Sequence, residues 1–264
     1  MTATDRRADE YGAFCAAVRN LCAIDLTQYK RRQMERRVRT FAERCGITRL
    51  DEYACMLGDA PEELEVFLDR MTINVSQLWR NPEQWKLLES RILPAFAAQP
   101  RFNAWSAGCS YGAEAYTLAA ICAQVLPGVR TAIVGTDIDG RMVESARAGI
   151  FSEADARDVP RAERRRWFAE RDGLLHADAE LTALCRFEVA DLLAMRARQG
   201  IYDLVLCRNT VIYFTPDVRD ALHARLAKAL VLGGYLMVGS TERVRHPAAL
   251  GLEIAHPFVY RRVA

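Results

Sequence analysis

The chain has 264 residues, of which 51% are hydrophobic and 27% are charged, and its formal net charge is +2. This composition is that of a globular protein and excludes an intrinsically disordered chain. The small net charge excludes a protein that binds nucleic acid or an anionic membrane through its bulk charge, so any charged surface has to be local. From the length we expect two domains, or one large domain with an appendage.

The N-terminal residues and the cysteines indicate the compartment. The first ten residues are polar and charged, and no uncharged run reaches the length of a membrane span. We therefore expect no targeting segment and no membrane insertion. Eight cysteines are scattered without CxxC spacing and without a histidine cluster. This pattern predicts reduced thiols, no metal site and a cytoplasmic location.

The first part of the chain has the hydrophobic spacing of helices. Over residues 11–69, apolar residues recur three and four positions apart, as in amphipathic helices. Breaks near Asp25, Gly46 and Pro61 divide this part into about four short helices. We therefore expect an all-helical N-terminal domain over residues 1–72, which is not itself a catalytic fold.

The pattern changes in the second part of the chain. Residues 73–96 form a linker and a connecting helix, with a turn at Asn81-Pro82. From residue 97 to residue 264, short apolar runs alternate with helix-like segments, which predicts a parallel, doubly wound sheet. The runs expected to form strands are residues 102–107, 131–136, 202–207 and 235–238. A charged helix and an alternating stretch at 181–189 predict a small strand-containing insertion over residues 161–189.

Glycines follow the first predicted strand, in the sequence GCSYGAE at residues 108–114. Ligands bind beyond the carboxyl ends of the strands in such a sheet. The glycines permit a tight turn, and a helix beginning near Gly112 presents backbone amides that favour a carboxylate. Taken alone, the glycines favour a plain strand-to-helix turn over a ligand loop. Because Gly108 and Gly112 are four residues apart, it is not the GxGxxG of a dinucleotide site, which favours a smaller adenosyl ligand.

Polar residues also follow the other predicted strands. Asp137 lies 25 positions after Gly112, about where a ribose-binding acid is expected, and its carboxylate can accept both ribose hydroxyls. Asp191 and then the pair Arg208-Asn209 follow later strands. Arginine and asparagine also cap sheets and form turns, but together with Asp137 a ligand site is the better interpretation.

Five separated blocks resemble motifs of the chemotaxis receptor methyltransferase family, CheR. In chain order the blocks are TINVSQLWR at 72–80, WSAGCSYG at 105–112, TDID at 136–139, CRN at 207–209 with IYF at 212–214, and GG at 233–234 with GSTE at 239–242. They are similar to the family's TxNxTxFFR, WSAGCSxG, TDID, CRNxxIYF and GGxLxxGxSE, and the resemblance extends from about residue 11 to residue 242. The sequence departs from the family's GEEPY, which reads GAEAY at 112–116.

The resemblance implies a fold and an activity. The fold is α/β, with an N-terminal all-helical receptor-docking domain followed by a Rossmann-like class I S-adenosylmethionine-dependent methyltransferase sheet with a small insertion. The activity is methyl transfer from S-adenosyl-L-methionine to glutamate carboxylates of methyl-accepting chemoreceptor cytoplasmic domains. The products are glutamate 5-O-methyl esters and S-adenosyl-L-homocysteine. We expect a monomer that binds no nucleic acid.

The resemblance also implies site residues. Those lining the S-adenosylmethionine site are Asn74, Ser76, Arg80, Gly108, Glu114, Asp137, Asp191, Leu192, Arg208 and Asn209. Two catalytic residues are implied. Arg80 holds the carboxylate of the cofactor, and Tyr213 lies beside the transferable methyl group.

Two questions stay open at the level of sequence. The basic helix around Arg32, Arg36 and Arg37 is suited to docking acidic receptor helices, and equally to a solvated surface with local ion pairs. The altered loop at 112–116 leaves an alternative function, an S-adenosylmethionine-binding sensor or adaptor with little turnover. A methyltransferase acting on RNA or a small molecule is a further alternative.

Overall fold

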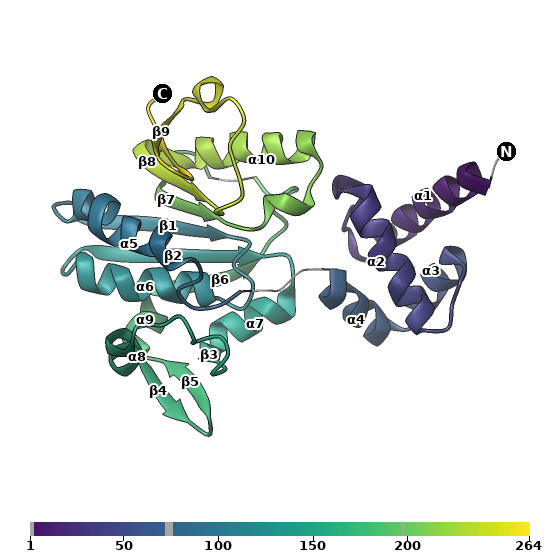
Figure 1. The fold of residues 1–264 in the computed structure, drawn as a ribbon, viewed down its shortest axis with the longest axis horizontal. Coiled ribbons are helices and arrows are strands. Elements are labelled where there is room, and N and C mark those ends of the chain that lie inside the picture. The colour runs from purple at the N-terminus through teal and green to yellow at the C-terminus, as the bar shows by residue number, and fades with distance from the viewer. Residues whose placement is uncertain (1–2, 72–75, 197) are drawn as a thin grey trace. The chain divides into compact units, whose positions relative to one another are not determined.

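The computed structural model describes residues 3–71, 76–196 and 198–264 (Figure 1). These residues form two compact units. The first unit comprises Met1–Ile73 and Tyr213–Val218, and the second comprises Asn74–Ile212 and Arg219–Ala264. Within the described residues, no helix has both the length and the apolar composition needed to cross a bilayer.

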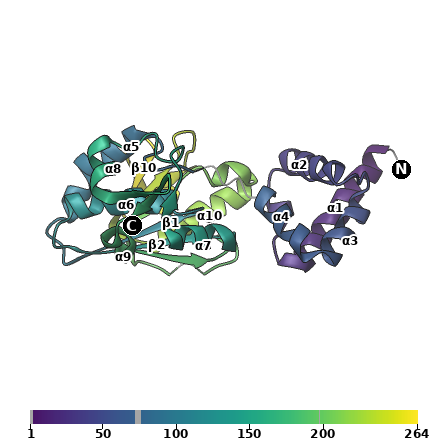
Figure 2. The same ribbon diagram turned by 90° about the horizontal axis from the view of Figure 1, so that it is seen from below.

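The first unit is helical, and its helices group together in Figure 2. Its described α-helices are α1 (Ala3–Cys22), α2 (Arg31–Arg44), α3 (Leu50–Asp59) and α4 (Pro61–Met71), and η1 (Leu26–Gln28) is a 3-10 turn. Asp25 caps η1 by accepting the Thr27 N–H at 3.0 Å. The prediction of about four short helices is confirmed.

An aromatic cluster forms the centre of this helical core. The rings of Phe14 and Tyr53 stack with centroids 5.8 Å apart, and Phe67 meets both rings edge-on at 5.9 Å. All three side chains are buried. Aromatic pairs of this geometry add to the stabilisation that burial alone provides, so helices α1, α3 and α4 are held together at this point.

Residues 213–218 join the helical unit although they lie far away in the sequence. The Lys30 N–H donates to the Tyr213 carbonyl at 2.9 Å, and the Thr215 N–H donates to the Gln28 carbonyl at 3.0 Å. Tyr29 and Phe214 form an antiparallel bridge, with ring centroids 5.1 Å apart. No periodicity in the sequence predicts this pairing, because it depends on a single bridge between remote segments.

The second unit contains a seven-stranded sheet in the order β6-β2-β1-β7-β8-β10-β9. The strands are β1 (Arg101–Ala107), β2 (Arg130–Asp137), β6 (Cys185–Val189), β7 (Tyr202–Cys207), β8 (Leu230–Val238), β9 (Leu252–His256) and β10 (Val259–Arg262). The strands from β6 to β8 in this order are parallel, whereas β10 and β9 are antiparallel. The Rossmann-like fold is confirmed, and the four predicted strands are parallel, but the sheet is mixed because β10 and β9 add an antiparallel edge. Only Pro257 and Phe258 separate β9 from β10, and a parallel connection needs a dozen or more residues.

Helices pack against this sheet. The described helices and helical turns of the second unit are α5 (Pro82–Leu87), η2 (Leu88–Ile92), η3 (Leu93–Phe96), α6 (Ala113–Val125), α7 (Gly140–Ala148), α8 (Arg161–Trp167), α9 (Ala179–Leu184), η4 (Val211–Tyr213), α10 (Pro216–Ala229) and η5 (Pro247–Leu250). One end of η4 and one end of α10 lie in residues 213–218. Helix α6 is buried over its first ten residues. It therefore forms part of the main core, together with Phe102 and Leu204 of the sheet.

A second, three-stranded antiparallel sheet spans residues 150–177 and so begins before the predicted insertion at 161–189. It consists of β3 (Ile150–Phe151), β5 (Leu174–Ala177) and β4 (Phe168–Arg171), beside α8 (Arg161–Trp167). A strand-containing insertion is confirmed, but the alternating stretch at 181–189 is not part of its sheet. That stretch is the end of α9 (Ala179–Leu184) followed by β6 of the main sheet. Phe187 of β6 packs over Gly135 of β2, where an added Cβ would lie 2.6 Å from the Phe187 ring.

His223 on α10 is fully buried, and among the described residues neither of its ring nitrogens has a hydrogen-bond partner. Burial lowers the pKa of this histidine to about 4. Below pH 6.5 the unfolded chain therefore binds a proton here that the folded chain does not bind. The free energy of unfolding should fall as the pH drops from about 6.5 to about 4.

Replacing His223 with leucine should remove this acid sensitivity. Relative to wild type, we expect the His223→Leu variant to gain about 3 kcal/mol between pH 7 and pH 4 in urea unfolding experiments. The exposed His246, changed to leucine, is the matched control. Parallel pH profiles for wild type and His223→Leu would contradict the prediction.

Candidate functional site

The loop after β1 is hydrogen-bonded to the end of β2. The N–H groups of Gly108 and Cys109 both donate to the Thr136 carbonyl, at 2.8 and 2.9 Å. Gly108 and Gly112 have φ values of 81° and 88°, which favour glycine. An added Cβ would lie 2.6 Å from Thr210 Oγ1 at Gly108. Packing of the chain against this loop therefore requires glycine at these positions, and close approach of a ligand here remains a prediction.

Asp137 lies at the carboxyl end of β2 with its carboxylate fixed. Its two oxygens accept the N–H groups of Ser110 at 2.7 Å and Asp139 at 3.0 Å. Burial raises the pKa of Asp137, and these backbone hydrogen bonds oppose the increase. Each carboxylate oxygen has a further lone pair, so Asp137 can still accept hydroxyl groups of a ligand.

Ser110 adds a polar atom beside this carboxylate, and no role was predicted for it from the sequence. Its Oγ is buried and has no hydrogen-bond partner among the described residues. Its backbone has φ 49°, which is uncommon for a residue with a side chain. A buried hydroxyl without a partner costs free energy, so a ligand that hydrogen-bonds it would remove that cost.

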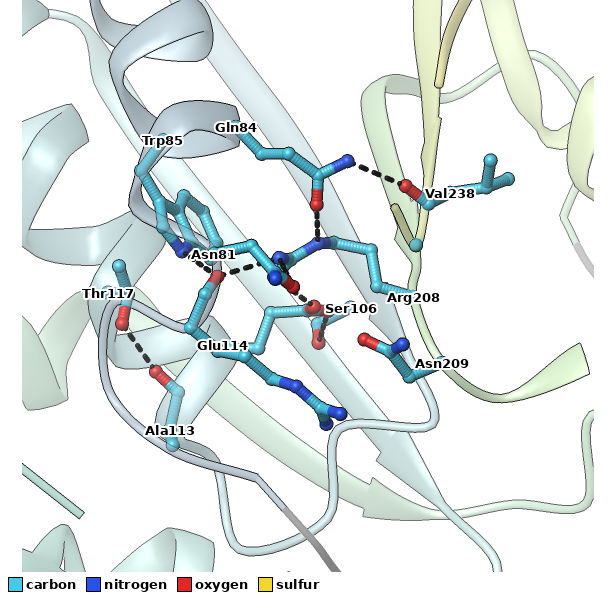
Figure 3. Close-up of polar contacts among 12 residues, drawn as sticks. Asn81, Gln84, Trp85, Ser106, Ala113, Glu114, Thr117, Arg208, Asn209 and Val238 are labelled. Atoms are coloured by element: carbon cyan, nitrogen blue, oxygen red, sulfur yellow. Dashed lines mark hydrogen bonds and ion pairs between the residues drawn. The ribbon is translucent and has the colours of Figure 1, made fainter. Parts of the chain in front are cut away.

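Arg208, just after β7, is the centre of a buried polar network (Figure 3). Only 2% of its side chain is exposed. Its guanidinium donates to Gln84 Oε1 at 2.9 Å, Glu114 Oε2 at 3.2 Å, the Arg80 carbonyl at 2.7 Å and Asn81 Oδ1 at 3.2 Å. These bonds engage most of its five N–H donors. The geometry therefore gives Arg208 a structural role in addition to the ligand contact expected from the sequence.

Glu114 on α6 shares this network. Ser106 Oγ donates to one carboxylate oxygen at 2.7 Å, and Arg208 pairs with the other. Burial lowers the pKa of Arg208, while the charge of Glu114 opposes that decrease. The structure thus brings together two of the predicted cofactor residues as a buried ion pair.

Arg80 lies in a turn with an unusual backbone. Its neighbours Trp79 and Asn81 have φ values of 54° and 57°, and a bulky residue such as tryptophan rarely adopts this conformation. The Trp79 N–H donates to Thr117 Oγ1 at 3.0 Å, and Trp85 Nε1 donates to the Arg80 carbonyl at 2.9 Å. The turn is therefore held by hydrogen bonds on both sides of Arg80.

Asn209 is positioned by Glu242, for which no role was predicted from the sequence. The N–H groups of Asn209 and Gly239 donate to Glu242 Oε2 at 2.9 and 2.6 Å. Burial raises the pKa of this carboxyl group. Glu242 thus ties the ends of β7 and β8 together, and the GSTE block was the signal in the sequence that could have indicated it.

The remaining predicted cofactor residues are placed as follows. The Ser76 carbonyl accepts the Tyr111 hydroxyl, which also lies 2.8 Å from Asp155 Oδ1. Asp191 accepts the Leu193 N–H at 2.7 Å, and Leu192 is buried. Asn74 lies outside the described residues.

The predicted methyl-transfer and docking residues Tyr213, Arg32, Arg36 and Arg37 belong to the helical unit. Arg32 and Arg36 are exposed on α2, whereas Arg37 is partly buried and donates to the Arg70 carbonyl. Burial lowers the pKa of Arg37. The three arginines are therefore not equivalent: Arg37 supports the helical unit, and Arg32 and Arg36 are presented to solvent.

Two family models together match nearly the whole chain. Residues 74–253 match the model described as "CheR methyltransferase, SAM binding domain", and residues 9–72 match "CheR methyltransferase, all-alpha domain". The chain belongs to the CheR methyltransferase family. The family resemblance found in the sequence is thus confirmed.

Two relatives of this CheR chain are similar to it along almost their full length. A chemotaxis protein methyltransferase of Listeria innocua is 31% identical over 253 residues, which cover 95% of this chain and 96% of the relative. Chemotaxis protein methyltransferase 1 of Vibrio cholerae is 30% identical over 254 residues, which cover 92% of each chain. The likeness therefore includes both units.

The cofactor of this CheR methyltransferase is S-adenosylmethionine, and the residues present fit it. The glycine loop permits close approach, Asp137 offers acceptors for ribose hydroxyls, and Ser110 offers a buried hydroxyl beside them that has no partner among the described residues. The role of each residue toward the cofactor remains a prediction.

Proposed function

We propose that this CheR methyltransferase esterifies glutamate side chains on the cytoplasmic domains of chemoreceptors, which requires a cytoplasmic enzyme. The observation that carries the proposal is the full-length likeness, both units included, to proteins named chemotaxis protein methyltransferases. Because the all-alpha domain is shared as well as the cofactor domain, the likeness favours a common protein substrate over RNA or a small molecule.

The proposed chemistry requires little proton transfer. S-adenosylmethionine supplies an activated sulfonium methyl group. The carboxyl group of a solvent-exposed glutamate has a pKa of about 4.3 and is already ionised at neutral pH, so no general base is needed. When bound, the cofactor would supply the methyl group to a glutamate oxygen, and its sulfur would keep the electron pair of the broken carbon–sulfur bond. The residues of the chain therefore act by positioning the reactants and excluding water.

Three residues have proposed roles in this positioning. Asp137, held by two backbone amides, accepts the ribose hydroxyls. Arg80, in its fixed turn, binds the carboxylate of the cofactor through its planar fork. Tyr213 orients the incoming glutamate with its hydroxyl group.

The helical unit is proposed to dock the receptor through Arg32 and Arg36 of α2. Both are exposed, and among the described residues neither guanidinium has a hydrogen bond or an ion pair. Neighbouring Arg31 and Arg39, in contrast, pair with Glu35 at 3.2 and 3.0 Å. The basic face therefore has two cations without an internal partner in the described part of the chain, which suits an acidic protein surface.

Replacing Arg32 and Arg36 together with glutamate is expected to raise the KM for receptor fragments about ten-fold. The kcat and the affinity for S-adenosylmethionine should stay unchanged, and the difference in KM should shrink at high salt because exposed charges are screened. The exposed pair Lys86 and Arg91, changed to glutamate, controls for the change in net charge. An unchanged KM would remove this docking surface.

The proposed function is tested by transfer of labelled methyl groups from S-adenosylmethionine to chemoreceptor cytoplasmic fragments. We expect label on fragments with intact glutamates and none on fragments in which the candidate glutamates are replaced by alanine. Equal labelling of both fragments would contradict glutamate as the acceptor.

A further inference from the structure

Gln84 is a buried polar residue at the start of α5. It is 6% exposed, and it lies four positions after Arg80, directly behind the turn in which Trp79 and Asn81 have positive φ. The five sequence motifs of the family resemblance do not include it. A buried amide is costly unless its polar atoms are paired, so its hydrogen bonds show which groups it serves.

Both ends of the Gln84 amide are used (Figure 3). Its Nε2 donates to the carbonyl of Val238, the last residue of β8, at 3.0 Å. Its Oε1 accepts the Nε–H of Arg208, the residue after β7, at 2.9 Å. One side chain of α5 therefore connects the carboxyl ends of two neighbouring strands of the sheet.

Gln84 and Trp85 together restrict the orientation of the Arg208 guanidinium. Gln84 accepts its Nε–H, and its Cζ lies over the Trp85 ring, 4.9 Å from the ring centroid. Both contacts are directional, the first as a hydrogen bond to a charged donor and the second as a cation–π interaction. The plane of the guanidinium is thereby fixed.

The fixed guanidinium also stabilises the backbone turn around Arg80. Arg208 Nη2 donates to the Arg80 carbonyl at 2.7 Å and to Asn81 Oδ1 at 3.2 Å. Backbone conformations of this kind persist only where the surroundings over-determine them. If Arg208 rotated, the turn would lose two of its hydrogen bonds, and Arg80 and Asn81 would be free to relax.

We propose that Gln84 is a positioning residue for the S-adenosylmethionine site, which acts through Arg208 on the turn that carries Arg80. The proposal rests on the assignment of Arg80 to the cofactor. It does not depend on the identity of the methyl acceptor, because cofactor binding can be measured without any acceptor. Its failure is therefore distinguishable from a failure of the proposed receptor methylation.

The test is titration calorimetry of the full chain with S-adenosylhomocysteine. Gln84→Met keeps the length of the side chain and removes both hydrogen bonds, and we expect its Kd to rise about ten-fold. Gln84→Glu keeps an acceptor for Arg208 Nε but cannot donate to Val238 when ionised, and it should recover most of the affinity. Lys86→Met, an exposed change on the same helix, is the matched control and should bind as wild type does.

Thermal unfolding of each variant separates positioning from a merely structural role. A higher Kd for Gln84→Met in a sample that is folded at the assay temperature, with recovery by Gln84→Glu, supports the proposal. Unchanged affinity in folded Gln84→Met overturns it. Equal weakening by both variants also overturns it, because the bond to Val238 rather than the bond to Arg208 would then matter. If Gln84→Met does not fold, the Kd of Gln84→Glu decides, since the proposal requires it to be near that of wild type.

Discussion

Replacing Arg208 with methionine is expected to lower the free energy of unfolding by about 3 to 5 kcal/mol, because the change breaks a buried ion pair and leaves one charge without its partner. Glu114 would keep its bond from Ser106 but lose its ion pair with Arg208. The Arg80 carbonyl and Asn81 would also lose the donors that Arg208 provides. Urea unfolding monitored by tryptophan fluorescence measures the loss, and affinity for S-adenosylhomocysteine should fall below detection.

A second replacement, at Glu114, separates the effect of the unpaired charge on stability from the effect of the lost hydrogen bonds on cofactor affinity. In the double variant Arg208→Met with Glu114→Gln, the uncompensated charge is gone, so part of the lost stability should return while cofactor affinity stays low.

Arg219→Met is the matched surface control. Arg219 pairs with Asp220 at 2.9 Å near the surface, and its loss should cost less than about 1 kcal/mol. Wild-type stability in Arg208→Met would contradict the role given to this network.

Replacing Asp137 with asparagine is expected to weaken binding of S-adenosylhomocysteine about a hundred-fold, since hydrogen bonds to a charged acceptor are worth about 1.5 to 3 kcal/mol each. The amide retains one acceptor and introduces a donor that faces the N–H groups of Ser110 and Asp139. Calorimetry measures the loss of affinity directly.

Asp139→Asn is the matched control for this change. Asp139 lies two residues further on and caps α7 by accepting the N–H groups of Arg141 and Met142. Asparagine caps helices about as well as aspartate, so cofactor affinity should remain within about two-fold of wild type. Equal effects of the two substitutions would show that Asp137 has no special role in binding.

Local patterns made much of the fold predictable. The four buried strands appeared as apolar runs, and Gly108 and Gly112 stand where positive φ is required. The helical unit followed from its hydrophobic spacing. The alternation of apolar and polar residues at 181–189 led to a wrong prediction of a strand in the insertion. Of its buried residues, Leu181 belongs to a helix and Phe187 belongs to an edge strand of the main sheet.

The network at the site was not predictable in the same way. Gln84 bonds to Val238 across 154 positions, and Arg208 bonds to Gln84 across 124. No local spacing encodes such contacts, because they arise only when the strands are placed side by side. The family resemblance supplied Arg208 as a cofactor residue, but its bonds to Arg80, Asn81 and Gln84 required the structure.

The most direct test of receptor glutamate methylation is the release of volatile methanol under mild alkali, after transfer of labelled methyl groups to chemoreceptor fragments. A glutamate methyl ester hydrolyses in base, so we predict that nearly all of the label on the receptor is released as methanol. The Asp137→Asn enzyme should give almost no label. Label that resists alkali would contradict glutamate esterification, and cofactor binding without any labelled receptor would favour an S-adenosylmethionine-binding sensor.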